Sequence, residues 1–256
     1  MSLAHDEALA VLYRDDHLIA VHKPAGLLVH RSEIDRRETR FAVQLLRDQI
    51  GQRVWPAHRL DRATSGVLLF ALDPATAGEV GRQFEAQQVG KRYLAVVRGH
   101  PPATGGIDHP LARRQDPAAW RDPRATASAP QAARTTYRTL ATVELPIAVD
   151  RYPSSRYALV ELTPETGRQH QLRRHMKHLA HPIIGDATYG KGRHNRMFAQ
   201  ELGCARLLLA CVDLDLTHPR SGAPLHLHAA PADDFTAVVE RLGWGAALRQ
   251  SCSGKV

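Results

Sequence analysis

The sequence His58-Arg59-Leu60-Asp61-Arg62-Ala63-Thr64-Ser65-Gly66 runs directly into the apolar stretch Val67-Leu68-Leu69-Phe70-Ala71-Leu72. The apolar stretch predicts a buried strand, and the polar residues before it predict a tight turn. Asp61 then lies on a loop at the edge of a sheet, where catalytic groups are often found. Arg59 and Arg62 flank it, and a nearby opposite charge favours the ionised carboxylate. Asp61 is therefore a candidate nucleophile; the alternative is a buried Asp that pairs with Arg59 or Arg62 and holds the turn.

The rest of the chain predicts more strands than helices, arranged mostly as neighbours in hairpins. Asp73-Pro74 is a helix start, because Asp caps the free amides and Pro fits the first helical position. This pattern predicts an α+β fold with a mixed, largely antiparallel β-sheet flanked by helices and loops. We expect strands at 9–12, 18–21, 67–72, 91–98, 134–145 and 156–162, helices at 41–49, from Asp73 to about Gly90, at 168–180 and from Asp233, and a hairpin from Leu207 to His228.

One stretch interrupts this pattern. From His100 to Pro130 the chain contains six prolines and the pair Gly105-Gly106, together with many Ala and Arg residues. This composition predicts a long Pro/Ala/Arg-rich surface insertion at about 100–133. We expect residues 1–256 to form a single domain that carries this insertion, since a chain of 256 residues can bury one large core.

The overall charge favours a polyanionic partner. Lys and Arg number 34 against 26 Asp and Glu, which gives a formal charge of +8. Nucleic acid is the first expectation and an anionic membrane surface the second. No apolar run approaches the roughly 20 residues that span a bilayer, so we expect no membrane partner. The three cysteines lack metal-type spacing and no secretory signal is evident, which predicts buried thiols and a cytoplasmic location.

A second polar constellation, Thr163 to His178, follows the strand predicted at 156–162. Gly167 permits a turn, and the helix after it begins beside Arg168. Helix amides and an arginine together can bind a phosphate or a carboxylate. The alternative is a solvated basic helix, but Leu172 and Met176 give this helix an apolar face that would order its basic one.

Four histidines in and just after this segment raise the question of a metal site. They are His170, His175, His178 and His181. His175 and His178 share a helix face, but no Glu lies between them in a zinc-protease pattern and no Cys is near in the sequence. We expect phosphate contact or surface exposure, and no metal.

Tyr93 follows Lys91 and Arg92 in a predicted strand. A Tyr in a strand is usually a core residue, but beside two cations its ring could stack on a flipped base. Flipping costs a few kcal/mol, and stacking on an aromatic ring returns roughly 1–3 kcal/mol. Tyr93 alone could not hold a base out, so phosphate contacts and a side chain that fills the gap, such as Arg62, would have to contribute.

The chain resembles the RluA-type pseudouridine synthases in four blocks that follow the order found in that family. The segment from His58 to Gly66 is similar to the family's catalytic motif, which is highly specific. The blocks are Lys23-Pro24-Ala25-Gly26-Leu27-Leu28-Val29-His30, His58 to Gly66, Lys91-Arg92-Tyr93, and Thr166 to His175 with Pro182-Ile183-Ile184-Gly185-Asp186 and Tyr189-Gly190.

This resemblance implies a stand-alone isomerase that converts uridine in RNA to pseudouridine without a cofactor. It implies Asp61 as the nucleophile, Arg173 as its ion-pair partner, Tyr93 stacked on the target base, Arg62 in the gap left in the RNA, and Leu172 in the pocket wall. No room remains before the first motif for the S4-type RNA-binding domain that many relatives carry, so we expect the catalytic domain to bind RNA itself, as a monomer. We expect RNA contacts at Arg59, Arg62, Arg168, His170, Leu172 and Arg174.

Within the family the chain most resembles the branch that modifies uridine 65 of transfer RNA, in segments such as Val29-His30-Arg31-Ser32 and Leu216-Thr217-His218-Pro219. It departs from many relatives at Leu209-Ala210-Cys211, where they have Leu-His-Ala. Two alternatives stay open: an enzyme that modifies ribosomal RNA, and a non-catalytic RNA-binding or chaperone protein with the same fold.

Overall fold

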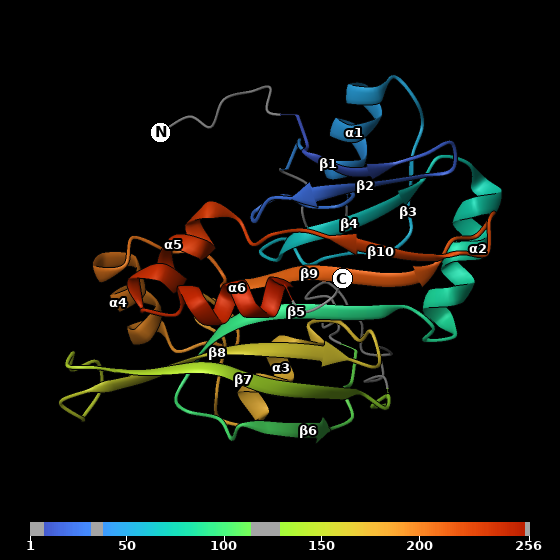
Figure 1. Cartoon of the computed structure of the whole chain (residues 1–256). Coiled ribbons are helices and arrows are strands. Elements are labelled where there is room, and N and C mark those ends of the chain that lie inside the picture. Colours follow the sequence, from blue (N-terminus) through green and yellow to red (C-terminus); the bar gives the residue numbers. More distant parts are fainter. Residues whose placement is uncertain (1–7, 32–37, 114–128, 254–256) are drawn as a thin grey trace, which may run out of the picture. The chain divides into compact units, whose positions relative to one another are not determined.

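The computed structural model describes residues 8–31, 38–113 and 129–253. The chain forms two compact units, Met1–Gly90 with Cys211–Pro231 and Lys91–Ala210 with Ala232–Val256. Both contain strands and helices (Figure 1). Seven pairs of neighbouring strands among the described residues are antiparallel. The expected α+β class with a mixed sheet is confirmed, whereas the single domain stays a prediction.

The first unit is built on a buried strand. Its strands follow the order β1-β2-β4-β9, with β3 paired to β4 and β10 to β9. All seven residues of β4 are buried, as is typical of a strand covered on both faces. On one face, Leu68 and Phe70 pack with Ala42 and Leu46 of helix α1. The elements are β1 (Val11–Arg14), β2 (Leu18–Lys23), α1 (Ala42–Ile50), β3 (Trp55–Pro56), β4 (Ser65–Ala71), α2 (Pro74–Glu85), most of β9 (Leu209–Thr217), and β10 (Pro224–His228).

The pairing of β2 with β4 positions two turns beside each other. These strands are antiparallel, and their register places Lys23, the last residue of β2, opposite Gly66 near the start of β4. The turn that leaves β2 and the turn that enters β4 therefore lie at the same end of these two strands. The Lys23-Pro24-Ala25-Gly26 segment and Asp61 both lie at this end.

Gly66 also allows the backbones of β4 and β9 to come very close. Its φ is +112°, and a Cβ atom added there would lie 1.9 Å from the carbonyl oxygen of Cys211 in β9. No side chain larger than hydrogen fits in that space. Ala210 and Cys211, at the position where many relatives have His-Ala, are fully buried.

Helix α2 begins as the sequence predicts. The Asp73 carboxylate accepts hydrogen bonds from the Thr76 amide at 2.8 Å and the Thr76 hydroxyl at 2.6 Å. These bonds lower the pKa of Asp73 to about 2, so the cap is charged in any neutral solution. The predicted end at Gly90 is wrong: the helix stops at Glu85, and Gly90 begins strand β5.

The second unit contains four strands in the order β5-β8-β7-β6. Helix α3 packs against β8 and helix α6 against β7 (Figure 1). The elements are β5 (Gly90–Arg98), β6 (Thr104–Asp108), β7 (Arg134–Leu145), β8 (Ser155–Pro164), α3 (Gln171–His178), α4 (Gly192–Glu201), α5 (Asp233–Arg241) and α6 (Gly245–Ser253).

The start of the predicted 100–133 insertion is not a loop. Residues Thr104–Asp108 form strand β6, which pairs with β7. Gly105 lies opposite Tyr137 in this pair, and a Cβ atom on Gly105 would lie 2.6 Å from the tyrosine ring. Glycine is therefore needed inside the strand to make room for the ring. Residues 114–128 of the insertion lie outside the described ranges.

Two further observations bear on the sequence expectations. In the described parts of the chain, no helix combines the length and apolar character needed to cross a bilayer. Cys204 and Cys211 are buried, as the sequence predicts, and Cys252 is half-buried.

Candidate active site

The turn that carries Asp61 is short and well ordered by hydrogen bonds. The Thr64 amide donates to the Asp61 carbonyl at 3.0 Å, which closes a four-residue turn. Thr64 and Ser65 are buried behind it, while Asp61 itself is half-buried. The turn thus holds the carboxylate at the start of β4 with part of its surface still accessible.

Lys23 ties this turn to the one after β2. Its side chain is fully buried, and its ammonium donates to the carbonyls of Pro24 at 2.9 Å, Leu27 at 2.8 Å and Arg62 at 3.1 Å. The Gly26 amide donates to the same Arg62 carbonyl at 2.8 Å. A buried ammonium is stable only when its protons are bonded, so Lys23 fixes the two turns together. In the sequence, Lys23 is only one member of a family block and carries no signal of this role.

The two arginines beside Asp61 differ in their contacts. Arg62 donates from Nε to the Gly26 carbonyl at 3.1 Å and forms an ion pair with Glu38 at 2.7 Å. Arg59 is exposed. Burial and the charge of Arg59 lower the pKa of His30, so His30 is neutral at pH 7. Arg59 therefore places an exposed positive charge two residues before Asp61.

The remaining sequence-predicted site residues belong to the second unit. Tyr93, on β5, is half-buried opposite Leu162 of β8. Its neighbour Arg92 is buried and donates to Glu161 at 3.1 Å and to Ser251 at 2.7 Å. Arg92 is therefore committed to the structure of the strand, whereas Tyr93 remains partly exposed.

Arg173 forms a buried, two-pronged ion pair with Asp186. Its Nε lies 2.6 Å from Oδ2 and its Nη2 lies 2.9 Å from Oδ1. Asp186 also accepts from the amides of Thr188 and Tyr189, each at 2.9 Å, and the Tyr189 ring lies 5.2 Å from the Arg173 guanidinium carbon. Such a pair fixes the direction of the guanidinium. Asp186 belongs to a family block in the sequence but was not among the predicted site residues.

We expect Asp186→Asn to lower the free energy of unfolding by about 3 kcal/mol, because it removes the carboxylate that forms two charged hydrogen bonds with the buried Arg173. Burial alone would raise the pKa of Asp186, but the hydrogen bonds from Arg173 and the two amides outweigh it and lower the pKa. The stabilisation is therefore complete above the ordinary pKa of Asp and is lost as the pH falls through the lower folded value. Urea unfolding measured from pH 7 down to acid should show the gap between wild type and variant closing below about pH 4.

The matched control is Asp108→Asn. Asp108 pairs with Arg134 at 2.9 Å, but both side chains are 61% exposed, and such a pair contributes at most about 1 kcal/mol. Equal losses in the two variants would contradict the structural role given to Asp186.

Arg168 and Arg174 bind backbone carbonyls on either side of the 114–128 segment. Arg168 Nε donates to the Ala132 carbonyl at 3.1 Å, and Arg174 Nη1 donates to the Ala112 carbonyl at 2.9 Å. Between these ends, Leu111 and Gln131 exchange a pair of backbone hydrogen bonds at 2.9 and 3.1 Å. The two arginines thus anchor the ends of the insertion, a role that the sequence did not reveal.

Helix α3 is shorter than the predicted 168–180, because its first turn is replaced by side-chain hydrogen bonds. The Gln171 side chain accepts from the Arg168 amide at 2.9 Å and donates to the Arg134 carbonyl at 2.8 Å. His170 has a left-handed conformation, with φ of +54°, and its Nδ1 lies 3.1 Å from the Tyr189 hydroxyl. Leu172 is 6% exposed, so it is a core residue of this helix.

His175 is a core histidine. Its Nδ1 lies 2.9 Å from the Thr135 hydroxyl and its Nε2 lies 3.1 Å from the His109 carbonyl. Burial lowers its pKa, so it is neutral. Both ring nitrogens therefore have a structural use.

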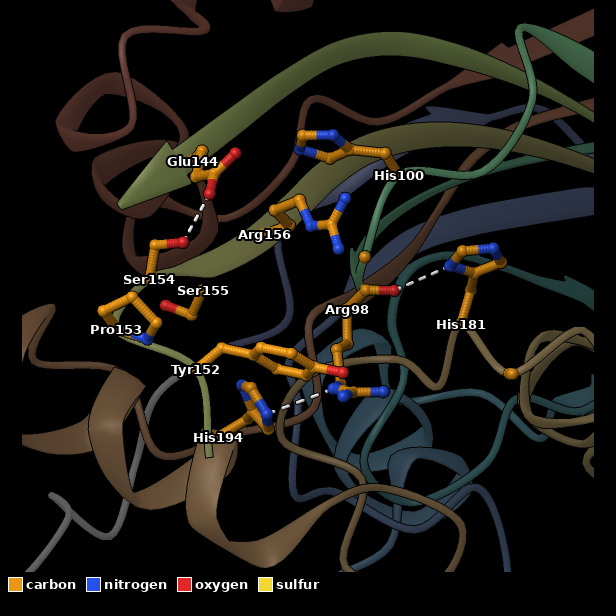
Figure 2. Close-up of a pocket in the computed structure, with 12 residues that line it drawn as sticks. Arg98, His100, Glu144, Tyr152, Pro153, Ser154, Ser155, Arg156, His181 and His194 are labelled. Carbon is orange, nitrogen blue, oxygen red and sulfur yellow. Dashed lines mark hydrogen bonds between the residues drawn. The ribbon is translucent and has the colours of Figure 1, made fainter. Parts of the chain in front are cut away.

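A separate polar pocket of about 500 Å³ lies within the second unit (Figure 2). His194 is central to its network: Nδ1 lies 2.6 Å from the Tyr157 hydroxyl, and Arg98 Nε donates to Nε2 at 3.1 Å. Burial lowers the pKa of His194 and raises the pKa of Tyr157 to about 12. None of the residues that line this pocket is a predicted site residue. The pocket is lined by Arg98, Gly99, His100, Glu144, Tyr152, Pro153, Ser154, Ser155, Arg156, Ala180, His181 and His194.

The predicted site residues are therefore divided between the two units. The first contains Asp61, Arg59 and Arg62, close to the buried Lys23. The set in the second unit is Tyr93, Arg168, His170, Leu172, Arg173 and Arg174.

Comparison with known proteins gives concordant results. The family described as RNA pseudouridylate synthase matches residues 17–178. The chain is 49% identical to tRNA pseudouridine synthase C of Yersinia pestis over 236 residues, which cover 92% of this chain and 91% of that protein. It is also 49% identical to the enzyme of that name from Pectobacterium carotovorum subsp. carotovorum over 242 residues, 94% of this chain but 64% of that longer protein. Among solved structures, human RNA Pseudouridylate Synthase Domain Containing 1 is similar with a TM-score of 0.69 and 26% identity, covering 97% of this chain and 98% of that one.

Proposed function

The chain belongs to the RNA pseudouridylate synthase family, and on that premise we propose that it isomerises uridine in transfer RNA with Asp61 as the catalytic nucleophile. Enzymes of this family are isomerases: the bond from the ribose to N1 of the uracil breaks, the base turns, and a bond from the same ribose to C5 forms. The proton leaves C5 and N1 gains one, so the reaction needs no redox partner. The chain's own side chains are then sufficient for the chemistry.

The observation that carries the proposal is the position of Asp61. It lies on a closed turn at the start of a fully buried strand, and the buried ammonium of Lys23 holds the backbone of that turn. A nucleophile must be held still against its target, because small displacements cost much of the rate. A half-buried carboxylate on a rigid turn meets this requirement.

The other residues receive roles that fit their chemistry. We assign Tyr93 to stacking on the base and to removing the proton at C5, and Arg173 to compensating the charge of Asp61. Arg173 donates from Nε and Nη2 to Asp186, which fixes the direction of its guanidinium. Leu172 is almost fully buried and supports the wall of the site in this proposal.

RNA binding requires cations beside the site. We propose that Arg62 exchanges its contacts with Gly26 and Glu38 for the gap that the flipped uridine leaves in the RNA. We assign phosphate contacts to exposed Arg59, to the half-buried Arg168 and Arg174, and to His170. The formal charge of +8 supports a polyanionic substrate.

Transfer RNA is the proposed substrate because relatives named for it match nearly all of this chain. Uridine 65 as the target, a monomeric enzyme and a cytoplasmic location remain predictions. Ribosomal RNA is the second candidate substrate. No contact among the described residues favours it.

The test is to incubate the purified chain separately with unmodified transfer RNA and ribosomal RNA, and then to map pseudouridine with a chemical probe specific for it. We expect one modified uridine in transfer RNA and none in ribosomal RNA. Modification of ribosomal RNA alone would overturn the substrate, and no modification of any cellular RNA would favour a non-catalytic RNA-binding protein.

A further inference from the structure

Two aspartates and two histidines face one another across the hairpin of β9 and β10. Asp213 and Asp215 are two residues apart on β9, and His226 and His228 are two apart on β10. The register pairs Asp215 with His226 and Asp213 with His228. Because side chains two apart on a strand share a face, these four lie on the same side of the hairpin.

Three of the four side chains bring one ligand atom each into a small space. His228 Nδ1 lies 2.6 Å from Asp213 Oδ1, and His226 Nε2 lies 3.7 Å from the same oxygen. The three atoms all lie within 4.8 Å of one another. The Asp213 side chain is 1% exposed, whereas those of His226 and His228 are 40% and 36% exposed, so the space between them is open to solvent.

The fourth side chain determines which atom His226 offers. The contact of 2.6 Å between His226 Nδ1 and Asp215 Oδ1 occupies Nδ1 and leaves Nε2 as the nitrogen on the side of Asp213. A carboxylate that orients a histidine in this way is the usual outer partner of a metal-bound imidazole.

We propose that Asp213 Oδ1, His226 Nε2 and His228 Nδ1 bind a divalent zinc ion, with Asp215 as the orienting partner and water in the fourth position. Tetrahedral zinc with bonds of about 2.0–2.1 Å separates its ligand atoms by about 3.3 Å. The 2.6 and 3.7 Å separations would each change by well under 1 Å to reach this value. The site shares no residue with the set proposed for the reaction.

The competing explanation is a pair of cross-strand His–Asp ion pairs that stabilise the hairpin. It accounts for the two 2.6 Å contacts, whereas the zinc site also accounts for the third ligand atom, His226 Nε2, lying within 4.8 Å of the other two. The two explanations differ in one measurable property, the binding of zinc at a defined stoichiometry.

The test is a titration of the chelator-treated full chain with zinc chloride by isothermal calorimetry, with thermal unfolding measured on the same samples. We expect one zinc ion per chain at micromolar concentration and a zinc-dependent rise in Tm. His226→Ala and His228→Ala should each weaken this binding at least about 100-fold, and Asp215→Asn should weaken it about 10-fold.

His17→Ala is the matched control, since His17 also faces an aspartate, Asp73 at 3.6 Å, and is 39% exposed, but among the described residues it belongs to no group of three ligand atoms within 4.8 Å of one another. Its zinc binding should equal that of the wild type. Tm values without zinc show whether each variant folds, and His226→Gln serves where His226→Ala does not. No binding by the wild type, or equal binding by the wild type and the His226→Ala/His228→Ala double variant, would overturn the proposal in favour of ion pairs.

Discussion

Replacement of Asp61 by Asn is expected to slow pseudouridine formation by at least about four orders of magnitude while leaving RNA affinity close to that of the wild type. The amide keeps the size and shape of the side chain but is neither charged nor nucleophilic. Because the turn is closed by backbone atoms, the Thr64 amide to the Asp61 carbonyl at 3.0 Å, the substitution should leave its geometry intact. Single-turnover rates on transfer RNA and filter binding at one fixed salt concentration measure the two quantities.

The control is Asp16→Asn, which removes an exposed carboxylate from the same unit. Its rate and affinity should both match the wild type. An Asp61→Asn enzyme with full activity would remove Asp61 from the chemistry. A variant that folds but loses rate and RNA binding together would reassign Asp61 to substrate binding.

Gly66→Ala is expected to destabilise the first unit by more than about 4 kcal/mol, enough to prevent recovery of folded protein. Two costs combine: φ of +112° strains any residue with a Cβ, and that Cβ would lie 1.9 Å from the Cys211 carbonyl oxygen. The Cβ position and the carbonyl oxygen are both fixed by the backbone, so no rotamer change can relieve the contact. Soluble yield and urea unfolding of any recovered protein measure the effect.

Gly222→Ala separates the two costs. Gly222 also has a positive φ, +72°, but a Cβ atom added there would meet no atom within 4 Å. Strain alone should cost about 1 kcal/mol. If Gly66→Ala were no worse than Gly222→Ala, the close approach of β4 and β9 would not exist in solution.

Elements with local signals could be predicted from the sequence. The helix start at Asp73-Pro74 and the hairpin from Leu207 to His228 both appear in the structure, because a cap, a proline or a turn marks them within a few residues. The helix predicted from Asp233 is present as α5, with Phe235, Val238 and Val239 buried.

Elements stabilised by distant contacts could not be predicted. Helix α4 buries His194, Met197 and Phe198. These positions have helical spacing, but the sequence does not show an apolar pattern there because histidine counts as polar. Strand β6 contains the pair Gly105-Gly106, which predicts a turn until the Tyr137 ring is seen to require a glycine opposite it.

The candidate site shows the same division. The motif around Asp61 predicts a carboxylate on a turn before a buried strand, and the structure has that turn and that strand. Lys23 and Asp186 were not predicted as site residues, because a lysine at 0% exposure and the carboxylate partner of Arg173 are recognised only from the carbonyls and the guanidinium around them.

Arg168 and Arg174 fix the chain on either side of the stretch between residues 113 and 129. The number of residues in that stretch is therefore free to vary. The chain enters and leaves this stretch through the paired backbone bonds of Leu111 and Gln131, and the two arginines hold the adjoining carbonyls. Relatives should therefore differ widely in length at this point without disturbing β6 or β7, and a peptide tag inserted there should be tolerated.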